Sequence, residues 1–177
     1  MSYHQSTAGR GTERFGSYGA AAGGSTLPVR FGAMGSKELK RTMEPAERVA
    51  PPESHVDLLE RPLITHFATV AANGSPRANP MWFVWDATAG VLKLTHTNER
   101  HNFRNLRREP RVAFSIVDPE DPYRYLQVRA VLEGIERDPT GAFYQSLQQR
   151  YRGRSSEVKD KDVRVILTFR PTGFKAR

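Results

Sequence analysis

Short apolar stretches separated by turn signals follow one another from about residue 63 to the end of the chain. Residues 63–71 are apolar and rich in β-forming side chains, and residues 111–117 alternate apolar with polar positions. Alternation with a period of two is typical of a strand with one buried face. The Asn73-Gly74 pair after the first stretch is the strongest short hairpin signal. The pattern predicts an antiparallel sheet.

The same interpretation along the chain predicts about six strands and two or three helices, the first of them short. The strands are expected at residues 63–71, 76–85, 91–95, 111–117, 123–136 and 163–169. The helices are expected at residues 53–60, 98–108 and 138–152, with caps at Asn98 and Asp138, a proline at Pro139 and a stop at Gly153. Because no parallel strand–helix–strand pattern occurs, a small antiparallel barrel with helices packed outside is the natural solution.

The chain divides near residue 50. Residues 1–50 are dominated by Gly, Ser, Ala, Thr and Arg, and their few apolar residues follow neither a helical nor a strand period. Such a composition buries too little apolar surface to offset the entropy of ordering the chain. We therefore expect a flexible basic tail at residues 1–50 and one globular domain at residues 51–177.

The composition excludes several kinds of chemistry but does not identify a binding partner. The 177 residues carry a formal net charge of +8, which favours an anionic partner such as nucleic acid, an anionic membrane surface or a polyanionic small molecule. The chain has no cysteine, so disulfides, thiolate metal sites and cysteine nucleophiles are excluded. No apolar run approaches the ~20 residues of a membrane span, and the first residues lack the apolar core of a secretory signal. These features predict a cytoplasmic protein.

The junction at residues 95–102 carries the strongest functional signal. A strand that ends in the small hydroxyl side chains Thr95 and Thr97 is followed at once by a predicted helix with Arg100 in its first turn. A helix start offers unpaired backbone N–H groups and the positive end of the helix dipole to an anion. The dipole disfavours a cation there, and a bound anion would remove that conflict. The junction indicates a seat for a phosphorylated cofactor, and a solvated arginine face is the plainer alternative.

The segment from Asn79 to Trp85 allows two interpretations. It is typical of a half-buried strand in which Pro80 marks an edge or a bulge, because proline cannot donate to a strand ladder. Alternatively, the proline interrupts pairing so that Met81 and Trp82 face a planar ring. Taken alone, these residues favour the structural interpretation.

The sequence gives little support for a metal site, a nucleophilic serine, a phosphate-binding loop or a nucleic-acid module. His66, His96 and His101 lack the spacing of metal ligands, so no metal site is predicted. No serine lies in a nucleophile-elbow context, no Gly-rich phosphate loop is present, and no catalytic side chain is assigned. The arginines of the predicted helix could neutralise several nucleic-acid phosphates, although no nucleic-acid module pattern occurs. Nucleic-acid binding is the leading alternative outside the enzymes.

Three passages resemble one family: ATVAANGSPR from Ala68, RNLRREPRVA from Arg104 and DPEDPYRYLQVR from Asp118. From about His66 to Phe169 the chain resembles the pyridoxamine-phosphate-oxidase-like superfamily. Within it, the chain resembles the flavin/deazaflavin oxidoreductases that depend on coenzyme F-420. This resemblance implies a mainly β fold with flanking helices, a six-stranded antiparallel split β-barrel of the FMN-binding type.

The resemblance also implies a function. It suggests a homodimer with the cofactor at the subunit interface, in which hydride passes from reduced F-420 to a small organic acceptor. The phosphate would lie at the strand-to-helix corner, the ring along the second strand, and the partner subunit would close the site. The expected cofactor-binding residues are Asn79, Pro80, Met81, Trp82, Thr95, His96, Thr97, Arg100, His101, Asn102, Tyr123, Tyr125 and Arg164.

One position departs from the family pattern. Asn102 stands where the family often has a lysine, so this residue can donate a hydrogen bond to a phosphate but brings no charge. His101 or Arg104 is expected to compensate. The alternatives that remain are an FMN-dependent oxidase or reductase, and a non-catalytic protein that binds a cofactor, a tetrapyrrole or nucleic acid.

Overall fold

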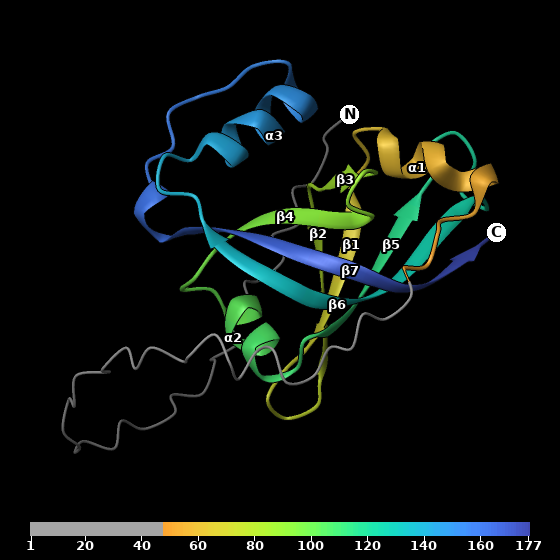
Figure 1. Ribbon diagram of the computed structural model, residues 1–177, viewed down its shortest axis with the longest axis horizontal. Coiled ribbons are helices and arrows are strands. Elements are labelled where there is room, and N and C mark those ends of the chain that lie inside the picture. The colour runs from red at the N-terminus through yellow and green to blue at the C-terminus, as the bar shows by residue number, and fades with distance from the viewer. Residues whose placement is uncertain (1–47) are drawn as a thin grey trace, which may run out of the picture. The chain divides into compact units, whose positions relative to one another are not determined.

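The computed structural model describes residues 48–177, so the predicted tail lies outside the described residues apart from positions 48–50, which belong to no helix or strand. The elements are, in chain order, η2 (Glu53–His55), α1 (Val56–Glu60), β1 (Thr65–Val70), β2 (Pro76–Met81), β3 (Val84–Asp86), β4 (Val91–Thr97), α2 (His101–Arg108), β5 (Arg111–Val117), β6 (Tyr125–Arg137), α3 (Ala142–Arg152), η3 (Lys161–Val163) and β7 (Arg164–Ala176). Figure 1 places α1 and α3 toward one end of the sheet and α2 toward the other.

The strands form one antiparallel sheet in the order β2-β1-β5-β6-β7-β4-β3, which curls into a half-barrel (Figure 1). The two longest strands, β6 and β7, pair along almost their whole length with two register shifts. The predicted mainly β class with flanking helices is confirmed. The predicted count of six strands is wrong, because the sheet of the described residues has seven.

The seventh strand arises where the predicted strand 76–85 breaks. The backbone leaves strand geometry at Trp82 and Phe83, and the Phe83 amide donates to the hydroxyl of Tyr151 at 3.1 Å in place of a strand partner. Because β2 pairs with β1 and β3 pairs with β4, the break carries the chain from one edge of the sheet to the other. Pro80 therefore lies in an edge strand, where a missing N–H is tolerated.

The predicted hairpin between β1 and β2 is confirmed. The Ala71 amide donates to the Ser75 carbonyl at 2.8 Å, and Gly74 has a φ of +81°. Glycine adopts this left-handed conformation without a steric penalty. The Asn73 side chain accepts the Ser75 amide at 3.1 Å. The turn fixes the register that brings residues of β2 to the site described below.

Both longer helices begin three or more residues later than predicted. The Asn98 amide donates to the Val163 carbonyl at 2.9 Å and so extends the contact between β4 and β7, which leaves Arg100 as the N-cap of α2. In α3 the N-cap is Gly141, with a φ of +72°. The Asp138 carboxylate nevertheless accepts the Phe143 and Tyr144 amides, at 3.4 and 3.2 Å. The prediction of Gly153 as the stop of α3 is confirmed.

Three phenylalanines pack against one another in the buried core. The ring centroids of Phe67, Phe114 and Phe169 lie 5.1 to 5.4 Å apart, and none of the three is more than 1% exposed. Leu58 and Leu59 of α1 are fully buried in the same cluster. Burial of large apolar side chains is the main favourable contribution to folding, so this cluster holds the curled sheet together.

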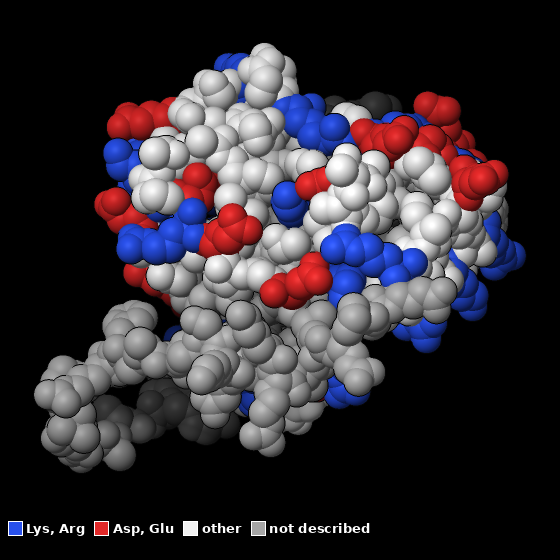
Figure 2. Space-filling view, in the orientation of Figure 1, with Lys and Arg blue, Asp and Glu red and all other residues white. Residues whose placement is uncertain are grey.

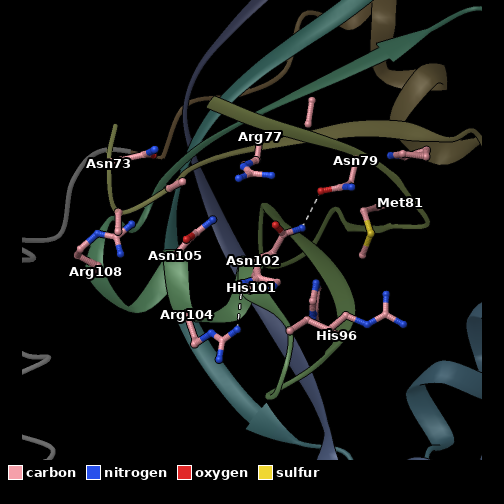
Figure 3. A pocket seen from close by; sticks show the side chains of 15 residues that line it. Asn73, Arg77, Asn79, Met81, His96, His101, Asn102, Arg104, Asn105 and Arg108 are labelled. Atoms are coloured by element: carbon pink, nitrogen blue, oxygen red, sulfur yellow. Dashed lines mark hydrogen bonds between the residues drawn. The ribbon is translucent and has the colours of Figure 1, made fainter. Parts of the chain in front are cut away.

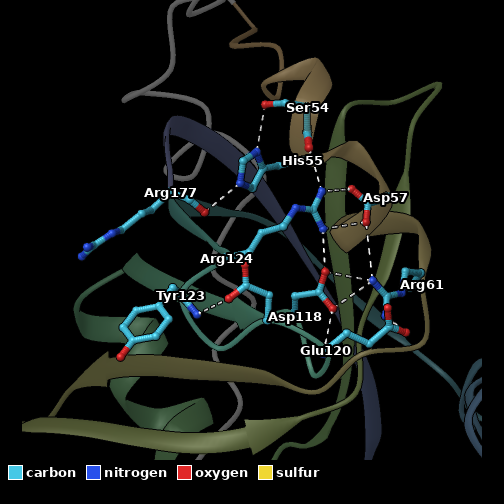
Figure 4. A network of polar contacts seen from close by, with 10 residues as sticks. Ser54, His55, Asp57, Arg61, Asp118, Glu120, Tyr123, Arg124 and Arg177 are labelled. Atoms are coloured by element: carbon cyan, nitrogen blue, oxygen red, sulfur yellow. Dashed lines mark hydrogen bonds and ion pairs between the residues drawn. The ribbon is translucent and has the colours of Figure 1, made fainter.

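A network of ion pairs fastens α1 to the loop between β5 and β6 (Figure 4). Arg124 donates to Asp57 of α1 and, at 2.7 Å, to the buried Asp118, and Arg61 reaches Asp118 at 3.2 Å. Hydrogen bonds from Arg124 hold the pKa of both carboxyl groups below their usual range. The loop is therefore held by charge as well as by packing.

These lowered pKa values predict a stability that is lost in acid. A carboxyl group with a lower pKa in the folded state stabilises the fold above its unfolded pKa of about 4, and this contribution disappears as the pH falls below that value. We expect the urea midpoint to drop between pH 5 and pH 3, and to drop less steeply in Asp118→Asn. The control is Asp162→Asn, which changes an exposed aspartate outside the network. The same dependence of the urea midpoint on pH in both variants would contradict the assignment of the acid sensitivity to Asp118.

Candidate functional site

A groove of about 1100 Å³ runs between β2, the end of β4 and the start of α2 (Figure 3). Its side chains come from the β1–β2 hairpin, from both strands and from the helix. They are Ala71, Ala72, Asn73, Arg77, Ala78, Asn79, Pro80, Met81, His96, Arg100, His101, Asn102, Arg104, Asn105 and Arg108. The groove is large enough for a cofactor, since ligand sites typically have volumes of ~300–1000 Å³.

The geometry of β2 and α2 explains which side chains face the groove. Alternate residues of a strand share a face, so Arg77, Asn79 and Met81 point the same way (Figure 3). On α2, residues four apart lie on one side of the helix, which brings Arg104 and Arg108 to the groove one turn apart. A strand face and a helix face thus meet across the groove.

The charged side chains that line the groove all carry the same sign. Arg77, Arg100, Arg104 and Arg108 line it, and no Asp or Glu is among its lining residues in the described chain. A cleft lined by charges of one sign focuses the electrostatic field and raises the local concentration of ions of the opposite sign. The groove is therefore built to attract an anion.

The start of α2 opens into the groove without a cap of its own. Arg100 makes no side-chain capping bond, and the first amides of a helix have no partner within it. Asn102 Nδ2 instead donates to Asn79 Oδ1 of β2 at 2.9 Å, and Arg104 Nη2 donates to His101 Nδ1 at 2.9 Å (Figure 3). The prediction of Arg100 in the first turn of the helix is wrong by one residue, because Arg100 is the N-cap that precedes His101. Its side chain nevertheless lines the groove at the start of α2, the end of the helix that attracts anions.

A second, smaller cavity of about 240 Å³ adjoins the groove. Its lining residues are Pro80, Met81, Trp82, Thr95, His96, Thr97, Arg100, Tyr144, Arg152 and Arg164. Pro80, Met81, His96 and Arg100 line both spaces. A planar group lying on Pro80 and Met81 would consequently border the smaller cavity.

Aromatic and guanidinium groups stack along the wall of the smaller cavity. The Trp82 indole lies nearly parallel to the Tyr151 ring, with 5.0 Å between the ring centroids. The guanidinium carbon of Arg152 lies 4.8 Å from the indole centroid. Arg164 stacks on Tyr144 at 3.6 Å, donates to both oxygens of Asp160 and reaches Thr95 Oγ1 at 3.1 Å. Such contacts hold these side chains in fixed orientations.

His96 lies between the two spaces and is 5% exposed. Burial lowers its pKa below the ordinary value, the charges of Arg100 and Arg164 act in the same direction, and the hydrogen bond with the Thr97 backbone opposes them. Its Nδ1 lies 3.0 Å from the Thr97 backbone. These effects favour the neutral form of His96, and the positive charge of the site comes from its arginines.

The structure brings most of the predicted site residues together. Those that line at least one of the two spaces are Asn79, Pro80, Met81, Trp82, Thr95, His96, Thr97, Arg100, His101, Asn102 and Arg164. Tyr123 and Tyr125 line neither space. Tyr123 is 74% exposed beside the ion-pair network (Figure 4). Tyr125 pairs with Val117 of β5.

Several lining residues were not predicted. Arg77 could have been found from its position two residues before Asn79, and Asn105 and Arg108 could have been found from the four-residue spacing of α2. Tyr144 and Arg152 could not, because no local pattern places α3 beside the break between β2 and β3. Their contribution depends on tertiary structure.

Two further observations concern the described residues alone. No group of three His, Asp or Glu side chains within residues 48–177 is arranged to hold a metal ion. None of the helices there is long and apolar enough to cross a membrane.

Comparison with known proteins gives three findings on the family and the fold. The sequence model of the family described as pyridoxamine 5'-phosphate oxidase matches residues 51–176. The chain is 51% identical to a solved F-420 reductase, with a TM-score of 0.67, over 71% of this chain and 98% of the reductase. The fold is shared with a conserved hypothetical protein of Mycobacterium tuberculosis, 22% identical with a TM-score of 0.58 over 76% of this chain and 89% of that protein.

A more distant structure has the same fold. General stress protein 26 of Bacillus anthracis is 17% identical, with a TM-score of 0.54 over 70% of this chain and 91% of that protein. No curated protein matches the sequence.

Proposed function

The chain belongs to the pyridoxamine 5'-phosphate oxidase family, and from this premise we propose that it is an oxidoreductase that uses coenzyme F-420. The family and its F-420 reductase relative support a flavin or deazaflavin cofactor. The choice of F-420 rests on the 51% identity to that reductase. Hydride would pass from the reduced cofactor to a small organic acceptor.

The observation that carries the proposal is the arginine-lined groove at the uncapped start of α2. Its volume of about 1100 Å³ and its lack of acidic lining residues in the described chain fit a planar cofactor with an anionic side chain. The backbone amides of His101 and Asn102, together with the Arg100 side chain, would hold the phosphate. Asn79, Pro80 and Met81 would lie along the ring.

The protein's part in such a reaction is positioning. Bound reduced deazaflavin supplies the hydride, and hydride transfer needs donor and acceptor held in contact rather than an acid–base pair. Stacked side chains such as Trp82 and Tyr151 keep the wall beside Met81 fixed. A positioning role agrees with the lowered pKa of the buried His96, because no charged acid–base pair is needed in the site.

Two parts of the proposal concern assembly and location. We propose a cytoplasmic homodimer in which a second copy of the chain completes the site. β2 supports this, because five of its six residues are exposed, on both faces of the strand. In the dimer Tyr123 and Tyr125, which line neither space of their own subunit, would approach the groove of the other subunit.

Two alternatives have some support. FMN also carries a planar ring and a phosphate, and the family description favours it. A nucleic-acid binder would use the positive charge, but on the face shown in Figure 2 acidic and basic side chains are interspersed, so no continuous basic surface forms there. The groove, rather than an open surface, concentrates the arginines.

Binding measured by fluorescence tests the proposal. Purified protein is titrated with oxidised F-420 and, in parallel, with FMN at the same ionic strength. We expect F-420 to bind at least about 10-fold more tightly than FMN, which corresponds to about 1.4 kcal/mol. Tighter binding of FMN would make the protein a flavin enzyme, and binding of neither would overturn the proposed activity.

A further inference from the structure

We propose that the smaller cavity is the acceptor site and that it selects a conjugated organic carboxylate. The inference rests on the proposed function, since it assigns a substrate class to the same oxidoreductase. It is carried by three observations: the position of the cavity, the unmatched charges on its wall and its size.

The cavity lies where a hydride acceptor must bind. It shares Pro80 and Met81 with the large groove, so a ring seated on these residues has the cavity along its edge or face. Hydride transfer requires the reacting atoms to be about 3–3.5 Å apart. The cavity touches the ring position, is not lined by His101 or Asn102, and shares with the phosphate seat only Arg100.

Three arginines line the cavity, and only one of them is neutralised within the described chain. Arg164 forms two hydrogen bonds with the Asp160 carboxylate, whereas Arg100 and Arg152 have no ion pair with any described carboxylate. The guanidinium carbon of Arg152 lies 4.8 Å from the centroid of the Trp82 ring. Since the guanidinium group has no carboxylate partner within the described residues, its N–H donors are available to the carboxylate of an acceptor.

Size and shape restrict the acceptor further. About 240 Å³ is below the usual range for drug-sized ligands, so a single ring or a short conjugated chain with its acid group fits better than a polycyclic compound. The walls formed by Trp82 and Tyr144 are flat and fixed by stacking. A planar acceptor could lie parallel to the cofactor ring with its carboxylate directed toward Arg152.

Calorimetric titration with trans-cinnamate and its neutral amide, trans-cinnamamide, tests the assignment. The two probes have nearly the same shape and differ in charge. The full chain is titrated free and after loading with oxidised F-420. We expect cinnamate to bind the loaded protein at least about 10-fold more tightly than cinnamamide, the difference that one charge-assisted contact provides.

Two matched variants show which arginine is responsible. Arg152→Gln should remove the preference for the acid while leaving the affinities for cinnamamide and for F-420 unchanged. Arg154→Gln removes the same charge from an exposed position that does not line the cavity, and it should keep the preference.

The outcomes separate the two proposals. Equal binding of acid and amide, or a preference that survives in Arg152→Gln, overturns the inference even when F-420 binds tightly. Displacement of F-420 by cinnamate also overturns it, because the acid would then occupy the phosphate seat. If F-420 does not bind at all, the proposed function fails, and the acceptor assignment fails with it whatever the free chain binds.

Discussion

The variant Arg100→Ala is expected to raise the dissociation constant for F-420 by about 10- to 150-fold. Arg100 lines both spaces, has no carboxylate partner within the described residues and stands at the N-cap of α2. A charge-assisted hydrogen bond contributes about 1.5–3 kcal/mol, which gives this range. The measurement is the fluorescence titration already described for the wild-type protein.

The same variant should hardly change stability. Arg100 is exposed, and exposed substitutions away from buried features usually change the free energy of unfolding by about 0.5 kcal/mol or less. Thermal unfolding without cofactor should therefore be shifted by about 2 °C at most. Arg154→Ala is the charge-matched control and should bind F-420 normally. A dissociation constant that stays the same in Arg100→Ala would contradict the placement of the phosphate at this helix start.

Local patterns in the sequence were sufficient for most of the sheet. The alternation at β5 and the Asn73-Gly74 turn depend on contacts within a few residues, and both appear as predicted. The start of α2 was displaced because Asn98 donates to Val163, a residue 65 positions away. A contact of that kind leaves no periodic signal in the sequence.

The site residues divide in the same way, into those that the sequence indicated and those that only tertiary contacts bring to the site. The β4–α2 corner was indicated by local features, the strand end and the helix start with Arg100. The residues of β2 were assigned to the site through the family resemblance, because the segment alone favoured the structural interpretation. Tyr144 and Arg152 were missed because α3 reaches the site only through tertiary contacts, such as that of Tyr151 with the Phe83 amide. The extra strand has the same origin, since Tyr151 replaces the strand partner at the break.

Removal of the Phe67 side chain should cause a large loss of stability. The ring is fully buried and contacts Phe114 and Phe169 at 5.1 and 5.3 Å between centroids. Phe→Ala changes in protein cores cost about 3–5 kcal/mol, because apolar contacts are lost and a cavity remains. Phe67→Ala should therefore lower the urea midpoint strongly, whereas Phe67→Leu, which keeps most of the volume, should lose less than half as much.

This change also tests how the core supports the site. Phe67 pairs with Asn79 across β1 and β2, so loosening β1 loosens the strand that lines the groove. A ligand that binds only the folded state stabilises it in proportion to the logarithm of its concentration above the dissociation constant. Saturating F-420 should consequently recover part of the lost unfolding temperature in Phe67→Ala, and clearly less of it in the double variant with Arg100→Ala at the same cofactor concentration. Equal recovery in both would show that the cofactor is held elsewhere in the fold.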